Sequence, residues 1–323
     1  MTRTADVSDL VERARRADPR AVARLISLVE NDSPLLREVA AALAPYSGTA
    51  QVVGLTGSPG VGKSTSTSAL VAALRKDGTR VGVLAVDPSS PFSGGALLGD
   101  RVRMQDHATD EGVFIRSMAS RGHLGGLSAA VPQALRVLDA AGCDIVLIET
   151  VGVGQAEVEI ASLADTIAVL LAPGMGDGIQ AAKAGILEIA DIFVVNKADR
   201  DGADQVARDL RYMQSLGGRH SAPGAWRPPI VKTVAVRAEG LDDLLAALAK
   251  HREWLARSGE FDRRRHARAS AEIEAIAVAE VRARFADMHG SAALSASAQR
   301  VIDRELDPYT AADDLVASLT ASA

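Results

Sequence analysis

Apolar and polar residues alternate in blocks through the middle of the chain, from about residue 49 to about residue 257. Short runs that are almost continuously apolar predict strands at residues 52–56, 81–86, 113–117, 145–150, 166–171, 192–196 and 230–236. Longer stretches, in which apolar residues recur every three or four positions, predict helices that include residues 64–75, 127–140, 179–189, 203–215 and 241–255. Apolar strands separated by helices are typical of a sheet covered on both faces. We therefore expect an α/β fold with a mostly parallel sheet flanked by helices.

Residues 1–46 have a different pattern and are expected to form an N-terminal helical extension. Asp18-Pro19 and Ser33-Pro34 have the residue types that begin helices, because aspartate or serine caps the first turn and proline suits its first position. Apolar residues follow each pair at helical spacing. The segment Pro45-Tyr46-Ser47-Gly48 then interrupts the pattern and separates the extension from a core domain at residues 47–257.

Residues 258–323 are expected to form a C-terminal helical arm. The arm opens with a basic run of the kind that usually forms a solvated helix face. An apolar stripe at helical spacing follows, made of Ile273, Ile276, Val281 and Phe285. Such a stripe needs a partner surface, which is either the core domain or a second subunit. Asp307-Pro308 is expected to cap a final short helix.

Composition narrows the function classes. Hydrophobic residues make up 47% of the 323 positions, so a large buried core is feasible. The net charge of −5 gives no basic surplus, so no nucleic-acid partner is expected. The single cysteine, Cys143, excludes a disulfide framework, and its place before an apolar run predicts a buried structural thiol. With neither a signal peptide nor an apolar run of ~20 residues in the sequence, we expect a cytoplasmic protein without a membrane partner.

Residues 57–64 give the clearest indication of a binding site. They read Gly-Ser-Pro-Gly-Val-Gly-Lys-Ser and lie between an expected strand and an expected helix. Glycines in this context let backbone N–H groups surround an anion, and the N-terminus of the helix adds positive charge. Lys63 would reach the β- and γ-phosphates, and Ser64 would offer its hydroxyl to Mg²⁺. The motif predicts a nucleoside triphosphate site formed by Gly57, Ser58, Pro59, Gly60, Val61, Gly62, Lys63, Ser64 and Thr65.

Residues 196–199 read Asn-Lys-Ala-Asp and are expected to recognise the base. The carboxylate of Asp199 can accept two hydrogen bonds from guanine, whereas adenine presents the opposite pattern and would leave it unpaired. Asn196 would tie this loop to the phosphate loop, and the stem of Lys197 would cover the base plane. The backbone of Val234, Ala235 and Val236 is the expected contact for the guanine oxygen. The sequence therefore favours a guanine nucleotide.

Four acidic residues lie at the ends of expected strands or in nearby loops, where Mg²⁺ would be held: Asp87, Asp100, Glu149 and Asp177. Glu149 has the position of the acid that usually accompanies the metal, although that acid is usually an aspartate. The alternative for each is a helix cap or a solvated loop carboxylate, above all for Asp177. Gly152 would present its N–H to the γ-phosphate and move when that group leaves.

Several longer segments resemble the MeaB/ArgK-type P-loop GTPases. They are GSPGVGKS, VDPSSPFSGGALLGDRVRM, MASRGHLGGL, ETVGVGQAE, GDGIQAAKAGILEIAD and NKAD. The resemblance covers the chain from about residue 5 to about residue 320. It implies a P-loop NTPase fold, Mg²⁺-dependent hydrolysis of GTP to GDP, and metal-binding and catalytic roles for Asp87, Asp100 and Glu149.

The resemblance also implies partners. These GTPases escort adenosylcobalamin-dependent methylmalonyl-CoA mutase, which implies that the protein gates cofactor delivery and protects the mutase, with GTP hydrolysis as the timer. Mobile loops are implied at residues 87–104, 149–157 and 174–183, of which the last contains Gln180 and Lys183. A homodimer joined through the C-terminal arm is implied as well. The family has also carried an older label as a kinase linked to amino-acid transport.

Hydrolysis would depend on charge neutralisation by Lys63, Mg²⁺ and the loop N–H groups. No arginine finger can be assigned among Arg101, Arg103, Arg116 and Arg121, so slow hydrolysis that a partner stimulates is expected. The alternatives are a P-loop kinase or ATPase, a metal-inserting GTPase, and a binding module whose hydrolysis is incidental. Metal insertion would need a Cys/His cluster, which one cysteine and six scattered histidines do not supply. His123 is interpreted as a loop residue that contacts backbone rather than as a proton carrier.

Overall fold

The computed structural model describes residues 6–31, 33–88, 104–107, 109–120, 130–150, 156–174, 188–216, 224–286 and 292–321. The chain forms two compact units, Met1–Phe261 and Asp262–Ala323. The first unit contains the sheet together with the N-terminal helices, and the second contains the C-terminal helices.

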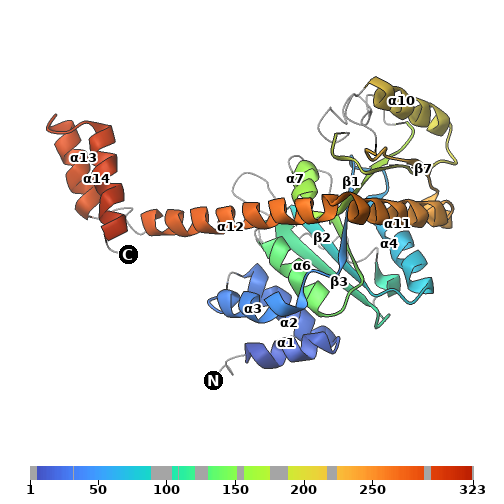
Figure 1. Ribbon diagram of the computed structural model, residues 1–323, viewed down its shortest axis with the longest axis horizontal. Coiled ribbons are helices and arrows are strands. Elements are labelled where there is room, and N and C mark those ends of the chain that lie inside the picture. The colour runs from blue at the N-terminus through green and yellow to red at the C-terminus, as the bar shows by residue number, and fades with distance from the viewer. Residues whose placement is uncertain are drawn as a thin grey trace. The chain divides into compact units, whose positions relative to one another are not determined.

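The first unit is built on a seven-stranded sheet in which every pairing between described strands is parallel (Figure 1). The strands are β1 (Gln51–Thr56), β2 (Val81–Pro88), β3 (Val113–Ser120), β4 (Ile145–Thr150), β5 (Thr166–Leu171), β6 (Ile192–Val195) and β7 (Ile230–Lys232). Their order is β3-β2-β4-β1-β5-β6-β7, which confirms the expected parallel α/β fold. Strand β1 lies inside the sheet, with β4 on one side and β5 on the other. In open sheets of this kind, ligands bind at the carboxyl ends of the strands, at the point where the strand order reverses, and the carboxyl end of β1 lies at that point.

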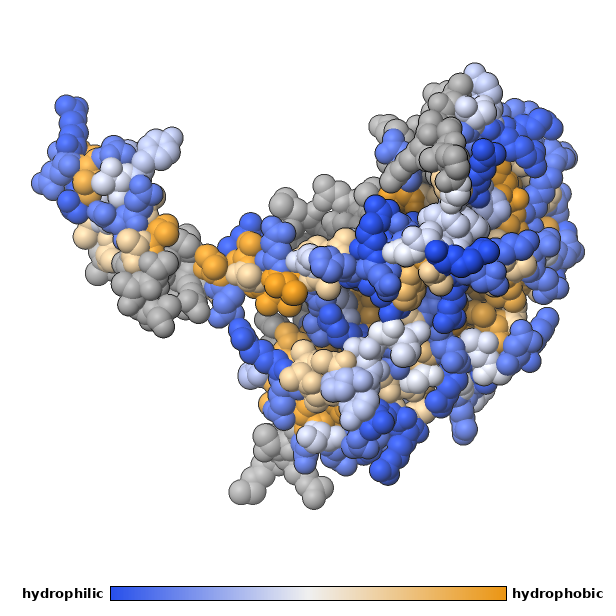
Figure 2. Space-filling model, in the orientation of Figure 1, coloured by the Kyte–Doolittle hydropathy of each residue, from blue (hydrophilic) through white to orange (hydrophobic). Residues whose placement is uncertain are grey.

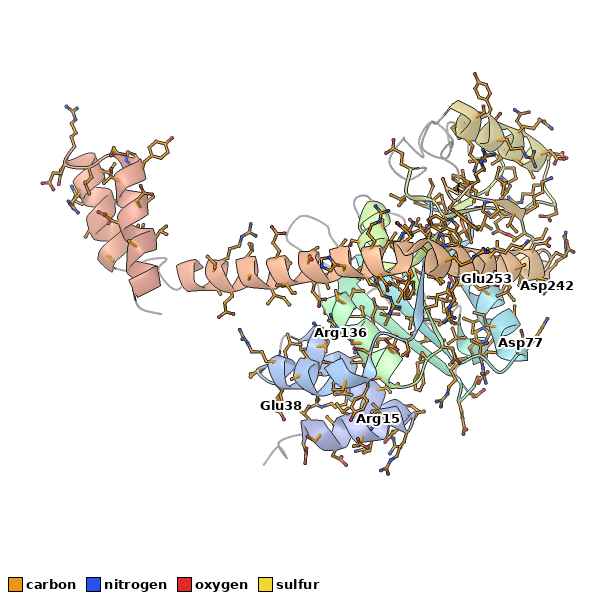
Figure 3. All side chains as sticks on the ribbon, viewed as in Figure 1. Arg15, Glu38, Asp77, Arg136, Asp242 and Glu253 are labelled. Atoms are coloured by element: carbon orange, nitrogen blue, oxygen red, sulfur yellow. The ribbon has the colours of Figure 1, made fainter. Side chains whose placement is uncertain are left out.

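Helices cover both faces of this sheet, and alternate residues of each strand face opposite layers. In β4, Ile145 and Leu147 belong to one hydrophobic cluster, which includes residues of α4 (Lys63–Lys76) and α11 (Leu241–Ser258). Val146 and Ile148 belong to the other cluster, which is formed with α6 (Ala130–Ala140), α7 (Ala156–Leu163), α10 (Ala203–Leu216) and the N-terminal helices. The outer surfaces of the helices are polar, as Asp242 and Glu253 illustrate on α11 (Figure 3). Burial on both sides explains why the strands read as continuous apolar runs.

The N-terminal helices are α1 (Val7–Arg15), α2 (Pro19–Glu30) and α3 (Leu36–Leu43), and they share a hydrophobic cluster with α6. Asp18 caps α2 as expected, since its carboxylate accepts hydrogen bonds from the N–H groups of Arg20 and Ala21. The prediction that Ser33-Pro34 begins the next helix is wrong. The Leu36 N–H donates to the Ser33 carbonyl across a turn, and α3 begins only at Leu36.

Aspartates placed immediately before three strands fix the alignment at the amino edge of the sheet. Asp144, Asp165 and Asp191 precede β4, β5 and β6, respectively. Each carboxylate accepts a hydrogen bond from a backbone N–H at the start of a neighbouring strand, with donor–acceptor distances of 2.7, 2.9 and 2.9 Å from Arg80, Val52 and Ile167. These side chains satisfy backbone donors that the sheet leaves over, at the edge opposite the carboxyl ends of the strands.

Asp139, near the end of α6, connects the N-terminal helices to the sheet. Its carboxylate accepts hydrogen bonds from the backbone N–H groups of Gly48, Thr49 and Ala50, the last at 2.9 Å. The Thr49 hydroxyl donates to the same carboxylate at 2.8 Å. This one side chain therefore fixes the path of the junction that leads into β1.

The last strand is shorter than expected. The sequence predicts a strand over residues 230–236, but β7 ends at Lys232 and a short 3₁₀ helix covers Ala235–Arg237. Val234 instead pairs with Glu239 in an isolated antiparallel bridge. The tight return requires Gly240, whose φ is 75° and where an added Cβ would lie 2.1 Å from the Lys232 carbonyl oxygen. Most of the expected helix at residues 179–189 lies outside the described residues.

Cys143 is buried within the hydrophobic cluster that contains α6, as expected. Burial raises the pKa of its thiol to about 12. The side chain is therefore a protonated, unreactive core residue at neutral pH.

The second unit begins at Asp262, within helix α12 (Glu260–Ala286), and also contains α13 (Ala292–Ile302) and α14 (Pro308–Ala321). Asp307 caps α14 as expected, accepting hydrogen bonds from the N–H groups of Tyr309 and Thr310. Helix α12 exposes Ile273, Ile276, Val278 and Val281, and Figure 2 shows apolar residues among polar ones along this helix. Within the described residues, no helix has the length and apolar character that crossing a membrane requires.

Candidate functional site

The loop between β1 and α4 lies at the carboxyl end of the central strand. Gly57 and Gly62 have φ values of 143° and 94°, which side chains rarely adopt. A Cβ at Gly57 would lie 2.3 Å from the Leu170 carbonyl oxygen, and one at Gly62 would lie 2.6 Å from Nδ2 of Asn196. Glycine is therefore required at both positions for the loop to approach its neighbours. This confirms the strand–loop–helix context that the phosphate-binding motif requires.

Lys63 is the first residue of α4, and its side chain returns over the loop. Its ammonium group donates hydrogen bonds to the carbonyl oxygens of Gly57 at 2.6 Å and Ser58 at 3.2 Å. The side chain is buried, with an exposed fraction of 7%. A positive charge is thus held beside the N-terminus of a helix, where a phosphate group is favoured.

Ser64 and Glu149 meet next to this loop. The Ser64 hydroxyl donates a hydrogen bond of 2.5 Å to Oε1 of Glu149, and both residues are more than nine-tenths buried. Glu149 is in β4, where it is aligned with Leu55 of β1 and Ala85 of β2. A buried hydroxyl and carboxylate in contact provide the oxygen ligands that Mg²⁺ prefers, so this pair fits a magnesium ion.

The other expected acidic ligands lie wholly or partly outside what the structure describes. Asp87 is at the carboxyl end of β2, on the same edge of the sheet as Glu149, and nothing is described of its side chain. Asp100, Asp177, Gly152, His123, Gln180 and Lys183 lie outside the described residues. So do most of the three loops at residues 87–104, 149–157 and 174–183. Among the residues that are described, no group of three or more His, Cys, Asp or Glu side chains is placed to hold a metal ion.

Asn196 joins three loops with its side-chain amide. Its Nδ2 donates to the Val61 carbonyl in the phosphate loop at 2.9 Å. Its Oδ1 accepts from the Thr233 hydroxyl at 3.2 Å and from the Ala235 N–H at 3.1 Å. The amide is buried, with an exposed fraction of 3%. The loops that would hold the phosphates and the base are therefore connected directly.

Lys197 lies beside the phosphate loop, and its ammonium group donates to the Gly60 carbonyl at 2.7 Å. Its φ of 56° directs the chain into the turn that carries Asp199. In the neighbouring segment, Val234 and Ala235 are buried, whereas Val236 is 78% exposed. The structure thus brings the residues expected to recognise the base together at one edge of the sheet.

Arg237 is a residue of this region that the sequence analysis missed. Its Nη1 donates to Oδ2 of Asp199 at 3.2 Å, and its Nε donates to Oε1 of Glu239 at 2.7 Å. The hydrogen bond from Arg237 lowers the pKa of Glu239, and the bonds to Glu239 and Asp199 raise the pKa of Arg237. Its position directly after residues 234–236 was the signal in the sequence that could have indicated it.

The chain is similar to known proteins along most of its length. The family model of the methylmalonyl-CoA mutase-associated GTPase MeaB matches residues 22–289. A putative GTPase of Pyrococcus abyssi is 48% identical over 307 residues, which are 95% of each chain. GTPase ArgK of Escherichia coli is 38% identical over 265 residues, which are 80% of each chain. A crystal structure described as a LAO/AO transport system kinase aligns with a TM-score of 0.72 and 28% identity over 99% of each chain.

The match covers the phosphate loop, the magnesium-compatible pair and the base-recognition loop within one segment of the chain. The chain therefore belongs to the MeaB family of methylmalonyl-CoA mutase-associated GTPases and is a P-loop GTPase.

Proposed function

We infer that this GTPase binds GTP with Mg²⁺ between the phosphate loop and the loop at residues 196–199, and hydrolyses it to GDP as a timer for methylmalonyl-CoA mutase. The observation that carries the inference is the pair of connected loops. Lys63 and the glycines of the phosphate loop lie on one side, and Asp199 lies on the other, with Asn196 hydrogen-bonded between them. This arrangement suits a ligand with a polyphosphate at one end and a hydrogen-bonding base at the other.

Hydrolysis would consist of attack by water on the γ-phosphate with GDP as the leaving group. Lys63 would neutralise charge on the phosphates, and the loop N–H groups would position them. Ser64 and Glu149 would hold Mg²⁺, with Asp87 and Asp100 as further ligands, and the ion would supply charge neutralisation at the phosphates. Gly152 would contact the γ-phosphate and move when that group leaves.

Recognition of the base would depend on Asp199, whose two carboxylate oxygens suit the two donors on the guanine edge. The Lys197 side chain, which already lies against the phosphate loop, would cover the base plane with its methylene stem. Residues 234–236 would place a backbone N–H near the guanine oxygen.

The partner would be adenosylcobalamin-dependent methylmalonyl-CoA mutase. The description of the matching family supports this proposal, since it names association with that enzyme. The GTPase would gate adenosylcobalamin loading and protect the mutase. The nucleotide-dependent loop with Gln180 and Lys183 would report the state of the site to the partner.

Stimulation by the mutase tests this role. Because no arginine finger is assigned within the chain, saturating mutase is expected to raise the turnover number for GTP hydrolysis at least about tenfold. The measurement is phosphate release at saturating GTP, with an unrelated protein at equal concentration as the control. An unchanged turnover number would contradict the proposed timer.

A second copy of the chain would cover the exposed apolar residues of α12. Support comes from the four large apolar side chains that this helix exposes, of which Ile273 is 68% exposed. We expect a mass close to twice 33.6 kDa by light scattering. A monomeric mass at tens of micromolar protein would contradict the homodimer.

A kinase is the second candidate, because the solved structure with a TM-score of 0.72 is described as a transport system kinase. The two activities differ in what receives the γ-phosphate. Release of inorganic phosphate from GTP without any added acceptor identifies a hydrolase. A requirement for an acceptor hydroxyl would identify a kinase.

A further inference from the structure

Arg237 and Asp199 form an ion pair on the residue expected to recognise guanine. Nη1 of Arg237 lies 3.2 Å from Oδ2 of Asp199, and the two side chains are 49% and 35% exposed. The residues are 38 positions apart in sequence, and the turn after β7 brings them together. The contact therefore depends on the fold of the base-recognition region and not on chance proximity along the chain.

This ion pair uses a carboxylate oxygen that full recognition of guanine also needs. The N1–H and the exocyclic amine of guanine together require both carboxylate oxygens of Asp199 in the plane of the base. Arg237 already donates to one of these oxygens. Each carboxylate oxygen has two lone pairs, so Arg237 competes with guanine where its Nη1 takes the lone pair that faces the base.

Glu239 provides a place for the displaced guanidinium. Two guanidinium nitrogens of Arg237 donate to the two carboxylate oxygens of Glu239, Nε at 2.7 Å and Nη2 at 3.2 Å. These bonds leave Nη1 for Asp199, so Arg237 can leave Asp199 without losing its fork-shaped pairing with Glu239.

We propose that Arg237 competes with guanine for Asp199, and that it lowers the affinity for guanine nucleotides and promotes their release. Guanine displaces Arg237 onto Glu239 on binding, and Arg237 returns to Asp199 as the nucleotide leaves. This mechanism rests on the proposed role of Asp199 in base recognition.

If Arg237 competes with guanine, removing Arg237 should affect the binding of guanine and hypoxanthine nucleotides differently. Hypoxanthine lacks the exocyclic amine of guanine and needs only one carboxylate oxygen of Asp199, which leaves the other to Arg237. Removing Arg237 should therefore strengthen binding of GDP but have little effect on binding of inosine diphosphate. A residue that only shaped the loop would change both affinities equally.

The experiment measures dissociation constants for GDP and inosine diphosphate by calorimetry, with Mg²⁺ present. Arg237→Gln is expected to tighten GDP binding about two- to fivefold, the range for an exposed ion pair, and to leave inosine diphosphate within about 1.5-fold. Arg237→Lys should give an intermediate value. The gain should shrink when salt rises from about 0.05 M to about 0.5 M, because exposed charges are screened.

Glu239→Gln should have the opposite effect and weaken GDP binding, because Arg237 then pairs with Asp199 alone. The double variant Arg237→Gln/Glu239→Gln should match Arg237→Gln. Arg252→Gln, an exposed arginine on α11, is the matched charge control and should leave both constants unchanged.

Weaker GDP binding by Arg237→Gln, or an equal change for both nucleotides, would overturn the competition. Asp199→Asn distinguishes this failure from failure of the proposed site. If Asp199→Asn abolishes the preference for GDP while Arg237→Gln changes nothing, the site stands and the competition is wrong. If Asp199→Asn leaves GDP binding intact, base recognition by Asp199 is itself wrong.

Discussion

Replacing Lys63 with alanine is expected to reduce the rate of GTP hydrolysis at least about 100-fold, the effect of removing one preorganised charge from a transition state. Its ammonium group is held over the phosphate loop by two backbone carbonyls, and no other described lysine side chain is buried in that loop. The measurement is single-turnover phosphate release at saturating GTP. Lys76→Ala, which removes an exposed lysine from the other end of α4, is the matched control and should retain full activity.

Lys63→Ala also distinguishes a GTPase whose hydrolysis acts as a timer for the mutase from a binding module whose hydrolysis is incidental. Its thermal unfolding should be compared with that of the wild type first, because the side chain is buried and its loss could loosen the loop. If the folded variant still supports the mutase while hydrolysing no GTP, the chain acts as a binding module. Hydrolysis within about threefold of the wild-type rate would remove Lys63 from the catalytic machinery altogether.

Asp199→Asn is expected to weaken binding of GDP and GTP about 100-fold or more, because a carboxylate that accepts two hydrogen bonds becomes an amide that can accept at only one atom. The amide nitrogen can instead donate to the C2 carbonyl of xanthine. The variant should therefore gain affinity for xanthosine diphosphate while it loses affinity for GDP.

Competition between labelled GDP and unlabelled GDP, xanthosine diphosphate or ADP measures this exchange of preference. Asp201→Asn, an exposed residue two positions further along, is the matched control and should keep the wild-type order. Retained GDP preference in Asp199→Asn would show that another residue selects the base.

The parts of the structure that are fixed by local chemistry could be predicted from the sequence. The phosphate loop is one of them, because a strand, a helix and positive φ angles at Gly57 and Gly62 are all required within a few residues. Strands β1, β4, β5 and β6 could be predicted because every residue in them is buried, which makes each one an almost continuous apolar run.

Features that depend on long-range contacts could not be predicted. The ion pair of Arg237 joins positions that only the turn after β7 brings together. That turn also ended the last strand early, since Val234 pairs with Glu239 and the Ala235 N–H donates to Asn196 instead of extending the sheet. The aspartates before β4, β5 and β6 look like loop residues in the sequence, because their acceptor role depends on which strands lie side by side.

The amide of Asn196 has a consequence for how nucleotide states can differ. Since one buried side chain holds the phosphate loop at Val61 and the base loop at Ala235, a displacement at either end must strain or break a shared hydrogen bond. If the nucleotide binds as proposed, its two ends are therefore not sensed independently. Loss of the γ-phosphate at one end can weaken binding of the base at the other end. Binding of the base can likewise displace the phosphate loop.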